Sequence, residues 1–344
     1  MTIRWKWLVP VAVGALALLS VPAADLYYES AWGTGCARCH EIGIDYEYWQ
    51  HSSHQKINCV ECHASSLQTN LRRVAAHISG EVPDQVHLRA GDVFAMLSRC
   101  EKCHRQEFAE WRSGAHSATY ARIFTDREHN RKRLLMDDCL RCHGMHFDGG
   151  MNDLVQPVNT IGPWRLNDAA YANQPAIPCL ACHSVHRSGA PLARPVERTG
   201  ARQEIVRPSV GLFDRRTRVN ISAAILPLPA VHEGDRPVKM SSDQRQAVCY
   251  QCHAPLSNLQ AGSGDDRTPL GIHEGLSCLA CHQKHGEATR QSCADCHPRL
   301  SNCGLDVEKM DTTFLNPKSA HNVHTAKCVD CHPKGVPKKR PAAG

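Results

Sequence analysis

The chain of 344 residues contains 19 cysteines and 22 histidines and carries a formal charge of +6. Aromatic residues make up only 6% of it, and its 42% of hydrophobic residues includes the cysteines. These values argue against a core made only of packed side chains, so another apolar group must fill much of the interior.

The N-terminus is a basic segment followed by an apolar run. Arg4 and Lys6 precede residues 7–24, which are interrupted by two prolines, one glycine and one serine. Basic residues before such a run indicate a cytoplasmic N-terminus. A run of about 18 residues is near the lower limit for a membrane span, and the Val-Pro-Ala sequence at 21–23 also fits a signal-peptidase site. Residues 1–24 are therefore a membrane anchor or a signal peptide.

Short secondary-structure elements are predicted in the rest of the chain. Helices are indicated by apolar spacing, charge pairs and caps at residues 67–79 before Gly80, at 105–112, at 118–136, and in a segment that Ser242 caps before Cys249. The sequence RVNISAAILPLP at 218–229 predicts a short strand that ends at prolines. The fold class that we expect is mainly α-helical, with short helices, loops and little β structure.

Eighteen of the cysteines form nine pairs with one spacing, and a histidine follows each pair directly. The pairs are Cys36/Cys39, Cys59/Cys62, Cys100/Cys103, Cys139/Cys142, Cys179/Cys182, Cys249/Cys252, Cys278/Cys281, Cys293/Cys296 and Cys328/Cys331. The histidines are His40, His63, His104, His143, His183, His253, His282, His297 and His332. C-x-x-C-H is the attachment motif of c-type haem, in which both thiols bind the porphyrin and the histidine binds the iron.

Other uses of paired cysteines explain this pattern less well. Residues three apart share a helix face, so two thiols reach one porphyrin edge. A zinc ribbon or a disulfide scaffold gives no reason for a histidine after every pair. We therefore predict nine covalently bound haem c groups, with the helices and loops wrapped around them. Cys303, the remaining cysteine, fits a small buried thiol, with a reactive thiol or an inter-chain disulfide as alternatives.

Haem attachment carries consequences for compartment and charge. It takes place outside the cytoplasm, so the chain must be exported. Nine haems add roughly eighteen propionate carboxylates, with which the excess Lys and Arg can pair. The positive charge therefore does not indicate a nucleic-acid partner. The basic tail PKGVPKKRPAAG is a solvated end or a docking tail for an acidic partner.

The spacing of the motifs divides the chain into regions. Five motifs lie between residues 36 and 183 and four between 249 and 332. We expect a five-haem region at 25–189, a haem-free connector at 190–248, and a four-haem region with the basic tail at 249–344.

Thirteen histidines lie outside the motifs, enough to give each of nine irons a second ligand. The predicted distal ligands are His54, His77, His116, His146, His186, His273, His285, His321 and His324. His51 and His232 are reserves, whereas His87 and His129 lie among polar residues and are expected at the surface. Met136, Met145 and Met240 are expected to pack rather than to bind iron. An iron with two histidine ligands has no vacant position, which favours low-potential electron transfer over catalysis.

The first 150 residues resemble the NapC/NirT/NrfH family of membrane-anchored multihaem quinol dehydrogenases. The likeness rests on the apolar segment, CARCHEI, YEYWQHSSHQKINCVECHAS, RRVAAHISGEVP and CLRCHGMH. It implies an uncleaved anchor, the periplasmic side of the cytoplasmic membrane, and electrons from menaquinol. Two departures stand out: Ile42 occupies the place of a methionine that ligates the first haem in relatives, and the family has four or five haems.

The leading hypothesis is a nonahaem electron carrier. Electrons would pass from the quinol pool, or from a quinol-oxidising partner, to a periplasmic reductase or an extracellular acceptor. One alternative is a reductase of nitrogen or sulfur oxyanions, with no catalytic residue assigned. Ammonia-forming nitrite reductases often have lysine in place of one motif histidine, and this chain has no CxxCK. The other alternative is a subunit of a polymeric cytochrome wire, which would be released after signal cleavage.

Overall fold

The computed structural model describes residues 5–63, 75–80, 88–187, 192–194, 204–253, 266–286, 290–297 and 309–335. These residues form mainly short helices and loops with a few two-stranded sheets, which confirms the expected fold class. Contacts divide the chain into two compact units. Unit 1 comprises Met1–Cys103 with Ser184–Ala190, and unit 2 comprises His104–His183 with Pro191–Gly344.

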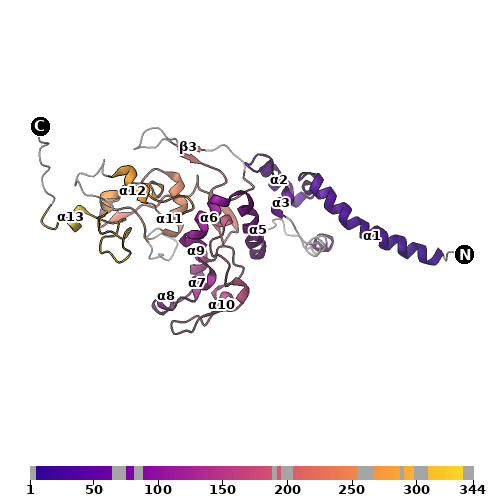
Figure 1. Cartoon of the computed structure of the whole chain (residues 1–344), viewed down its shortest axis with the longest axis horizontal. Coiled ribbons are helices and arrows are strands. Elements are labelled where there is room, and N and C mark those ends of the chain that lie inside the picture. Colours follow the sequence, from indigo (N-terminus) through magenta and orange to yellow (C-terminus); the bar gives the residue numbers. More distant parts are fainter. Residues whose placement is uncertain are drawn as a thin grey trace. The chain divides into compact units, whose positions relative to one another are not determined.

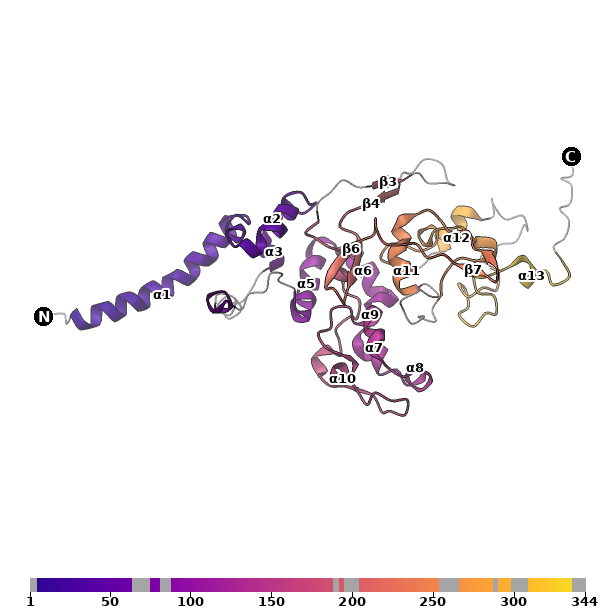
Figure 2. The same cartoon turned by 180° about the vertical axis from the view of Figure 1, so that it is seen from behind.

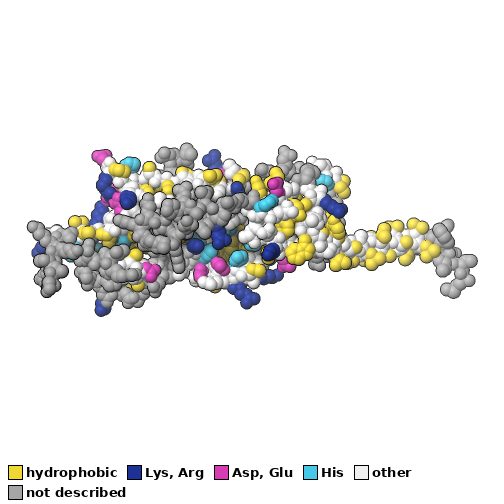
Figure 3. Space-filling view, turned by 90° about the horizontal axis from the view of Figure 1, so that it is seen from above, with side chains coloured by type: hydrophobic (Ala, Val, Ile, Leu, Met, Phe, Trp, Pro, Cys, Tyr) yellow, Lys and Arg dark blue, Asp and Glu magenta, His cyan; other side chains and the backbone are white. Residues whose placement is uncertain are grey.

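Unit 1 begins with one long helix, α1 (Trp5–Ser30), which Figure 1 shows as a single continuous rod. In the described part of the chain it is the one helix long and apolar enough to cross a membrane, over Leu8–Tyr28, and a signal sequence would pass the same test. Its leucines and valines are exposed, and Figure 3 shows them along the rod. Exposed apolar side chains on a helix of this length fit a lipid environment.

The rest of unit 1 consists of short helices. They are η1 (Cys36–Arg38), η2 (His40–Ile42), α2 (Gly43–Gln50), α3 (Cys59–His63) and α5 (Ala90–Cys103). Of the helix expected at 67–79, the described residues 75–79 are helical, and Gly80 ends them with a φ of 73°. A glycine adopts this left-handed conformation without the steric cost of a Cβ, so the expected C-cap is confirmed.

Unit 2 contains most of the remaining elements. Its helices are α6 (Arg105–Ser113), η3 (Ala115–Ser117), α7 (Tyr120–Phe124), α8 (Arg127–Lys132), η4 (Asp137–Cys139), α9 (Leu140–His143), α10 (Met151–Leu154), η5 (Ala169–Tyr171), η6 (Cys179–Ala181), η7 (Gln244–Gln246), α11 (Ala247–His253), η8 (Gly271–His273), η9 (Cys278–Ala280), α12 (Arg290–Cys296) and α13 (Cys328–Cys331). Four antiparallel pairs of strands complete it: β1 (Val155–Gln156) with β2 (Arg165–Leu166), β3 (Leu192–Arg194) with β4 (Glu204–Val206), β5 (Gly211–Asp214) with β6 (Val219–Ser222), and β7 (His232–Glu233) with β8 (Arg236–Pro237).

The side-chain core of unit 2 lies around α7, α9 and α10, which are neighbours in both Figure 1 and Figure 2. Tyr120 and Phe124 are almost fully buried, as are Leu140, Met151 and Leu154. Rings of Phe147 and Tyr171 pack against Tyr120, with ring centres 6.1 and 5.8 Å away. This aromatic cluster gives unit 2 a conventional core beside its haem motifs.

Some local predictions hold and others need correction. Residues 105–112 are helical in α6, and the strand expected at 218–229 is β6, although it ends before the prolines. The single helix expected at 118–136 is two helices, because Thr119 and Asp126 each cap a separate one. The prediction that Ser242 caps a helix is wrong. The cap of η7 is Asp243, whose carboxylate accepts a hydrogen bond from the Arg245 N–H.

The two units also group residues differently from the motif spacing. Residues 104–183, placed by spacing in a five-haem region, fold with residues 191–344. The reason is packing: motifs 4 and 5 and His116 lie against the motif that α11 carries, as described below.

Candidate haem-binding centre

In eight of the nine C-x-x-C-H motifs the backbone is helical or nearly so at both cysteines. These motifs occupy α3, the end of α5, η4 with α9, η6, α11, η9, α12 and α13. In η6 and η9 the helix ends one residue before the second cysteine, which still has a right-handed helical conformation. The two sulfur atoms of each pair therefore lie on the same side of the turn, as the spacing predicts. None of the eighteen motif cysteines, all of which the structure describes, forms a disulfide. Both cysteines of each motif are therefore in the reduced state that attachment to haem requires.

The first motif departs from this geometry at Cys39. Cys36 begins η1, but the helix ends at Arg38, and Cys39 has an extended backbone with φ −89° and ψ 129°. The expectation that both thiols share one helix face is therefore wrong for Cys39. The physical reason is that the turn closes early: the Cys39 N–H donates to the Cys36 carbonyl oxygen at 3.2 Å, and the chain turns away before η2.

The two thiols of the first motif also differ in their surroundings. Cys39 is exposed, whereas Cys36 is half-buried and its thiol is hydrogen-bonded to that of Cys59 in motif 2. That contact lowers the pKa of Cys36 to about 7 before attachment. Haem attachment at Cys39 stays a prediction from the motif. It requires the backbone of Cys39 to change from extended to helical, so that its thiol lies on the same side as that of Cys36.

Five motif histidines lie opposite five histidines from outside the motifs. The pairs, with the distances between ring centres, are His63–His186 at 5.7 Å, His116–His253 at 6.2 Å, His183–His285 at 5.9 Å, His273–His297 at 6.4 Å and His282–His324 at 5.9 Å. The first pair belongs to unit 1 and the other four to unit 2. Every pair joins one predicted proximal histidine to one predicted distal histidine.

The partners within a pair come from distant parts of the sequence. His63 belongs to the second motif, whereas His186 lies three residues after the fifth. His183 of the fifth motif meets His285, which lies three residues after the seventh. His116 is carried by η3, between the third and fourth motifs, but faces the histidine of the sixth. The motif order alone does not predict such pairing.

Hydrogen bonds orient three of the non-motif rings. His186 Nδ1 lies 3.3 Å from an Asp45 carboxylate oxygen, His273 Nδ1 lies 2.9 Å from the Val323 carbonyl oxygen, and His324 Nδ1 lies 3.2 Å from the Asn322 amide oxygen. Histidines that bind metals donate their other N–H to such acceptors. The bonds at Nδ1 thus leave Nε2 for a metal ion.

The sequence analysis did not predict these hydrogen-bond acceptors of the histidine rings. Asn322 had a local signal, because it lies two residues before His324 and its side chain also accepts the His324 N–H at 3.0 Å. Asp45 had none, since 141 positions separate it from His186. The hydrogen bond from His186 holds the pKa of Asp45 below its usual range.

His146 is buried with an unsatisfied ring nitrogen. Its ring is stacked on Phe213 at 4.0 Å, and its Nε2 atom has no hydrogen-bond partner within the described residues. Burial lowers the pKa of His146 to about 4, so the ring is neutral. A buried, neutral imidazole with a free lone pair is costly unless it binds something, and a metal ion satisfies it. The residues therefore fit the haem iron that the motifs imply.

The remaining predicted distal ligands are His54, His77 and His321, which lie outside the five opposed pairs. His54 is half-buried, and its Nδ1 lies 3.5 Å from Ser53 Oγ. His77 is exposed and forms an ion pair with Glu41 at 3.2 Å, whereas His321 is half-buried.

The other histidines and methionines are placed as follows. The rings of His51, His129 and His232 are exposed, Met145 is buried, Met240 is half-buried and Met136 is exposed. His104 and His143 are exposed motif histidines, and His332 is half-buried at the end of α13. The side chain of His40, together with His87 and Cys303, lies outside the described part of the chain.

Known proteins match the chain in three places. The family model for cytochrome c554 and c-prime matches residues 99–160, and that for cytochrome c7 and related cytochrome c matches residues 234–298. The cytochrome c-type protein NrfH of Wolinella succinogenes is 39% identical over 163 residues, which cover 44% of this chain and 88% of the relative.

The chain belongs to the family of NrfH. It is a multihaem c-type cytochrome that binds haem c covalently. The family-model matches extend the cytochrome likeness to motifs 3 and 4 and to motifs 6 to 8. No solved structure matches this NrfH-related chain.

Proposed function

We propose that this NrfH-related chain carries nine haems and that most or all of their irons bind two histidines. We further propose that the chain moves electrons from membrane quinol to a redox partner outside the cytoplasm. The observation that carries the proposal is the set of five opposed histidine pairs. Two imidazoles that bind one metal ion from opposite sides, each at about 2.0 Å, have ring centres about 6 Å apart. The observed range of 5.7 to 6.4 Å matches that separation.

The paired histidines determine what the sites can do. When bound, the haem supplies a one-electron couple. The motif histidine and its partner would both bind the iron, which would leave no position for a substrate. Two histidine ligands also keep the potential low, because methionine ligation would raise it. Both consequences favour a relay over a catalytic centre.

The histidines of motifs 1, 3, 4 and 9 do not belong to the five opposed pairs. We assign His54, His77, His146 and His321 to the irons of motifs 1, 3, 4 and 9, without pairing them individually. His146 has the strongest support, from its buried and unsatisfied nitrogen. Residues 190–248, which carry no motif, serve as the haem-free connector between haem groups.

Packing at the first motif supports electron entry from the membrane. The Arg38 guanidinium lies 5.5 Å from the ring centre of Tyr27, near the end of α1. A Cβ on Gly35 would come within 2.9 Å of the same ring, so only glycine allows this close approach. Motif 1 is thereby held against the end of the apolar helix, where a lipid-soluble quinol is within reach.

The test is spectroscopic and uses the full-length chain. Haem content by mass and by absorbance should give nine haems per chain, and electron paramagnetic resonance should show low-spin iron. His186→Ala and His285→Ala should each convert one low-spin haem to high-spin while nine haems remain bound. His129→Ala, on exposed α8, is the control and should change no signal. Unchanged low-spin spectra in both ligand variants would contradict the pairing.

The electron donor is tested in vesicles. The chain, reconstituted with its N-terminal helix, should be reduced by a menaquinol analogue, and a chain lacking residues 1–30 should be reduced far more slowly. Equal rates would argue against entry at the membrane. Retention of residues 1–24 in the intact mass of the native protein would support the anchor and count against a released wire subunit.

A further inference from the structure

The sixth motif, Cys249–His253 on α11, contacts two other motifs of unit 2 and lies close to a third. It contacts motif 7 through a buried polar network and motif 4 through an arginine and two sulfur atoms. Motif 5 lies close to it through Cys182, and β5 links the two motifs. Since each haem is bonded to its motif, motifs in contact place their haems side by side.

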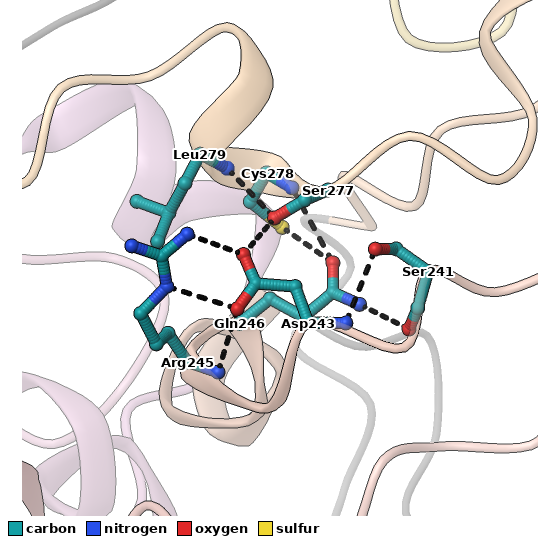
Figure 4. A network of polar contacts seen from close by, with 7 residues as sticks. All are labelled: Ser241, Asp243, Arg245, Gln246, Ser277, Cys278 and Leu279. Atoms are coloured by element: carbon teal, nitrogen blue, oxygen red, sulfur yellow. Dashed lines mark hydrogen bonds and ion pairs between the residues drawn. The ribbon is translucent and has the colours of Figure 1, made fainter. Parts of the chain in front are cut away.

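The contact with motif 7 is shown in Figure 4. Gln246 is fully buried, its amide oxygen accepts the Cys278 N–H at 3.3 Å, and its amide nitrogen donates to the Ser241 carbonyl oxygen at 2.7 Å. The buried carboxylate of Asp243 accepts the Ser277 hydroxyl at 2.7 Å and pairs with Arg245 at 2.9 Å. The residues that begin the motif 6 helix thus hold the turn that carries motif 7.

The contact with motif 4 involves Arg141, which lies inside that motif. Its guanidinium donates to the carbonyl oxygen of Gln251, inside motif 6, at 3.4 Å. The sulfur atoms of Cys142 and Cys252 also lie within hydrogen-bonding reach of each other. One cysteine from each of the two motifs therefore lies at the same point.

Motif 5 approaches α11 from another segment. The Cys182 thiol lies near that of Cys249. Cys182 also lies close to Cys252. The Gly211 N–H donates to the Cys182 carbonyl oxygen at 2.9 Å, and Gly211 begins β5, which packs on α11.

The distal side of the site is shared as well. His116, whose ring centre lies 6.2 Å from that of His253, is also near His282 of motif 7. By contrast, the described sulfur contacts of motif 8 are with motif 7, through Cys281 and the pair Cys293 and Cys296.

We propose that the haem on Cys249 and Cys252 is the junction of the relay, where routes to the haems of motifs 4, 5 and 7 meet. This inference rests on the proposed electron-transfer function. An electron leaving ferrous iron at a neighbouring motif reduces ferric iron at motif 6, and no proton, bond or further reactant is involved. The haem of motif 8 is a side position, reached through motif 7.

The test raises the potential of one haem and counts the neighbours that respond. His116→Met replaces an imidazole with a thioether, which raises the potential of the motif 6 haem. That haem then accepts its electron first, and the added negative charge makes adjacent haems harder to reduce. Potentiometric titration followed by paramagnetic resonance should show lowered midpoints for three other haems. The matched variant His273→Met, at motif 8, should lower one.

A shift of one neighbour or none in His116→Met, with the motif 6 potential itself raised, would overturn the junction. If His116→Met leaves every signal unchanged, the ligand pairing of the proposed function fails instead. In that case, or if the variant loses haem, a second measurement tests whether the motif 6 haem is the junction. Anomalous scattering at the iron edge in wild-type crystals should place the irons of motifs 4, 5 and 7 nearest to that of motif 6, and any other set refutes it.

Discussion

The two units hold their haem motifs by different means. In the described part of unit 1, the buried apolar side chains come from α5 alone, namely Ala90, Val93, Phe94 and Met96. Unit 2 has an aromatic and aliphatic core around Tyr120 together with buried amides such as Gln246. One opposed histidine pair lies in unit 1 and four lie in unit 2. The comparison indicates that unit 1 depends on its haems for a core, whereas unit 2 positions its haems on packed side chains.

The largest expected effect is in the core of unit 2. Tyr120→Ala removes a fully buried ring that contacts Phe124, Phe147 and Tyr171, and should lower stability by about 3–5 kcal/mol. Thermal unfolding of the haem-loaded chain, followed by absorbance and circular dichroism, measures it. Tyr48→Ala, an exposed position on α2 of unit 1, should change the midpoint little. Equal losses in the two variants would break the comparison.

A smaller effect is expected at the buried network of Figure 4. Gln246→Ala leaves the Cys278 N–H and the Ser241 carbonyl without their partner, and an unsatisfied buried group costs about 1–3 kcal/mol. The motif 7 haem should also lose some rigidity, seen as a broadened low-spin signal. Gln106→Ala, on the exposed face of α6, is the control. A variant as stable as wild type would show that packing alone holds motifs 6 and 7.

Asp45→Asn tests how unit 1 controls the potential of its paired haem site. The carboxylate of Asp45 makes His186 a more electron-rich ligand, and its negative charge favours ferric iron. Replacing it should raise the potential of the motif 2 haem and leave the other midpoints unchanged, as redox titration would show. Glu47→Gln removes an exposed carboxylate on the same helix, α2, outside every motif, and should shift none of them. A lowered motif 2 potential would contradict this role of Asp45.

Cofactor chemistry was easier to predict from the sequence than the arrangement of the cofactors. The cysteine spacing specifies attachment locally, because both thiols and the proximal histidine lie within five residues. The histidine surplus indicated a second set of ligands, and residues such as His186 and His324 were chosen from local context. Which motif each one faces depends on long-range packing, as in the approach of His116 to His253, and no local signal encodes it.

Local backbone geometry shows the same limit. The spacing of Cys36 and Cys39 predicts one helical turn, yet the turn ends at Arg38 and leaves Cys39 extended. The break at Thr125–Asp126 is similar, since apolar spacing continues across two separate caps. In both places a short-range hydrogen bond ends the helix. The spacing of the side chains along the sequence does not predict where that bond forms.

The smallest effect concerns an exposed charge cluster that ties β7–β8 to the later motifs of unit 2. Arg236 pairs with Glu233 and Glu274, each at 2.8 Å, and Lys327, just before motif 9, also contacts Glu233. Arg236 and the Lys239 N–H lower the pKa of Glu274 to about 2, below its value in the unfolded chain. The stabilisation is therefore complete above about pH 4.3 and is lost as the pH falls towards 2.

Glu274→Gln isolates this contribution. Wild type should be slightly more stable than the variant at pH 7, and the difference should shrink steadily between about pH 4.3 and pH 2. Salt should reduce it at neutral pH, because exposed ion pairs are screened. Denaturant unfolding at several pH values measures both trends. A stability difference that persists unchanged at pH 2 would mean that the Glu274 side chain stabilises unit 2 through packing. The edge of unit 2 would then be held by packing, as its core is, and not by charge.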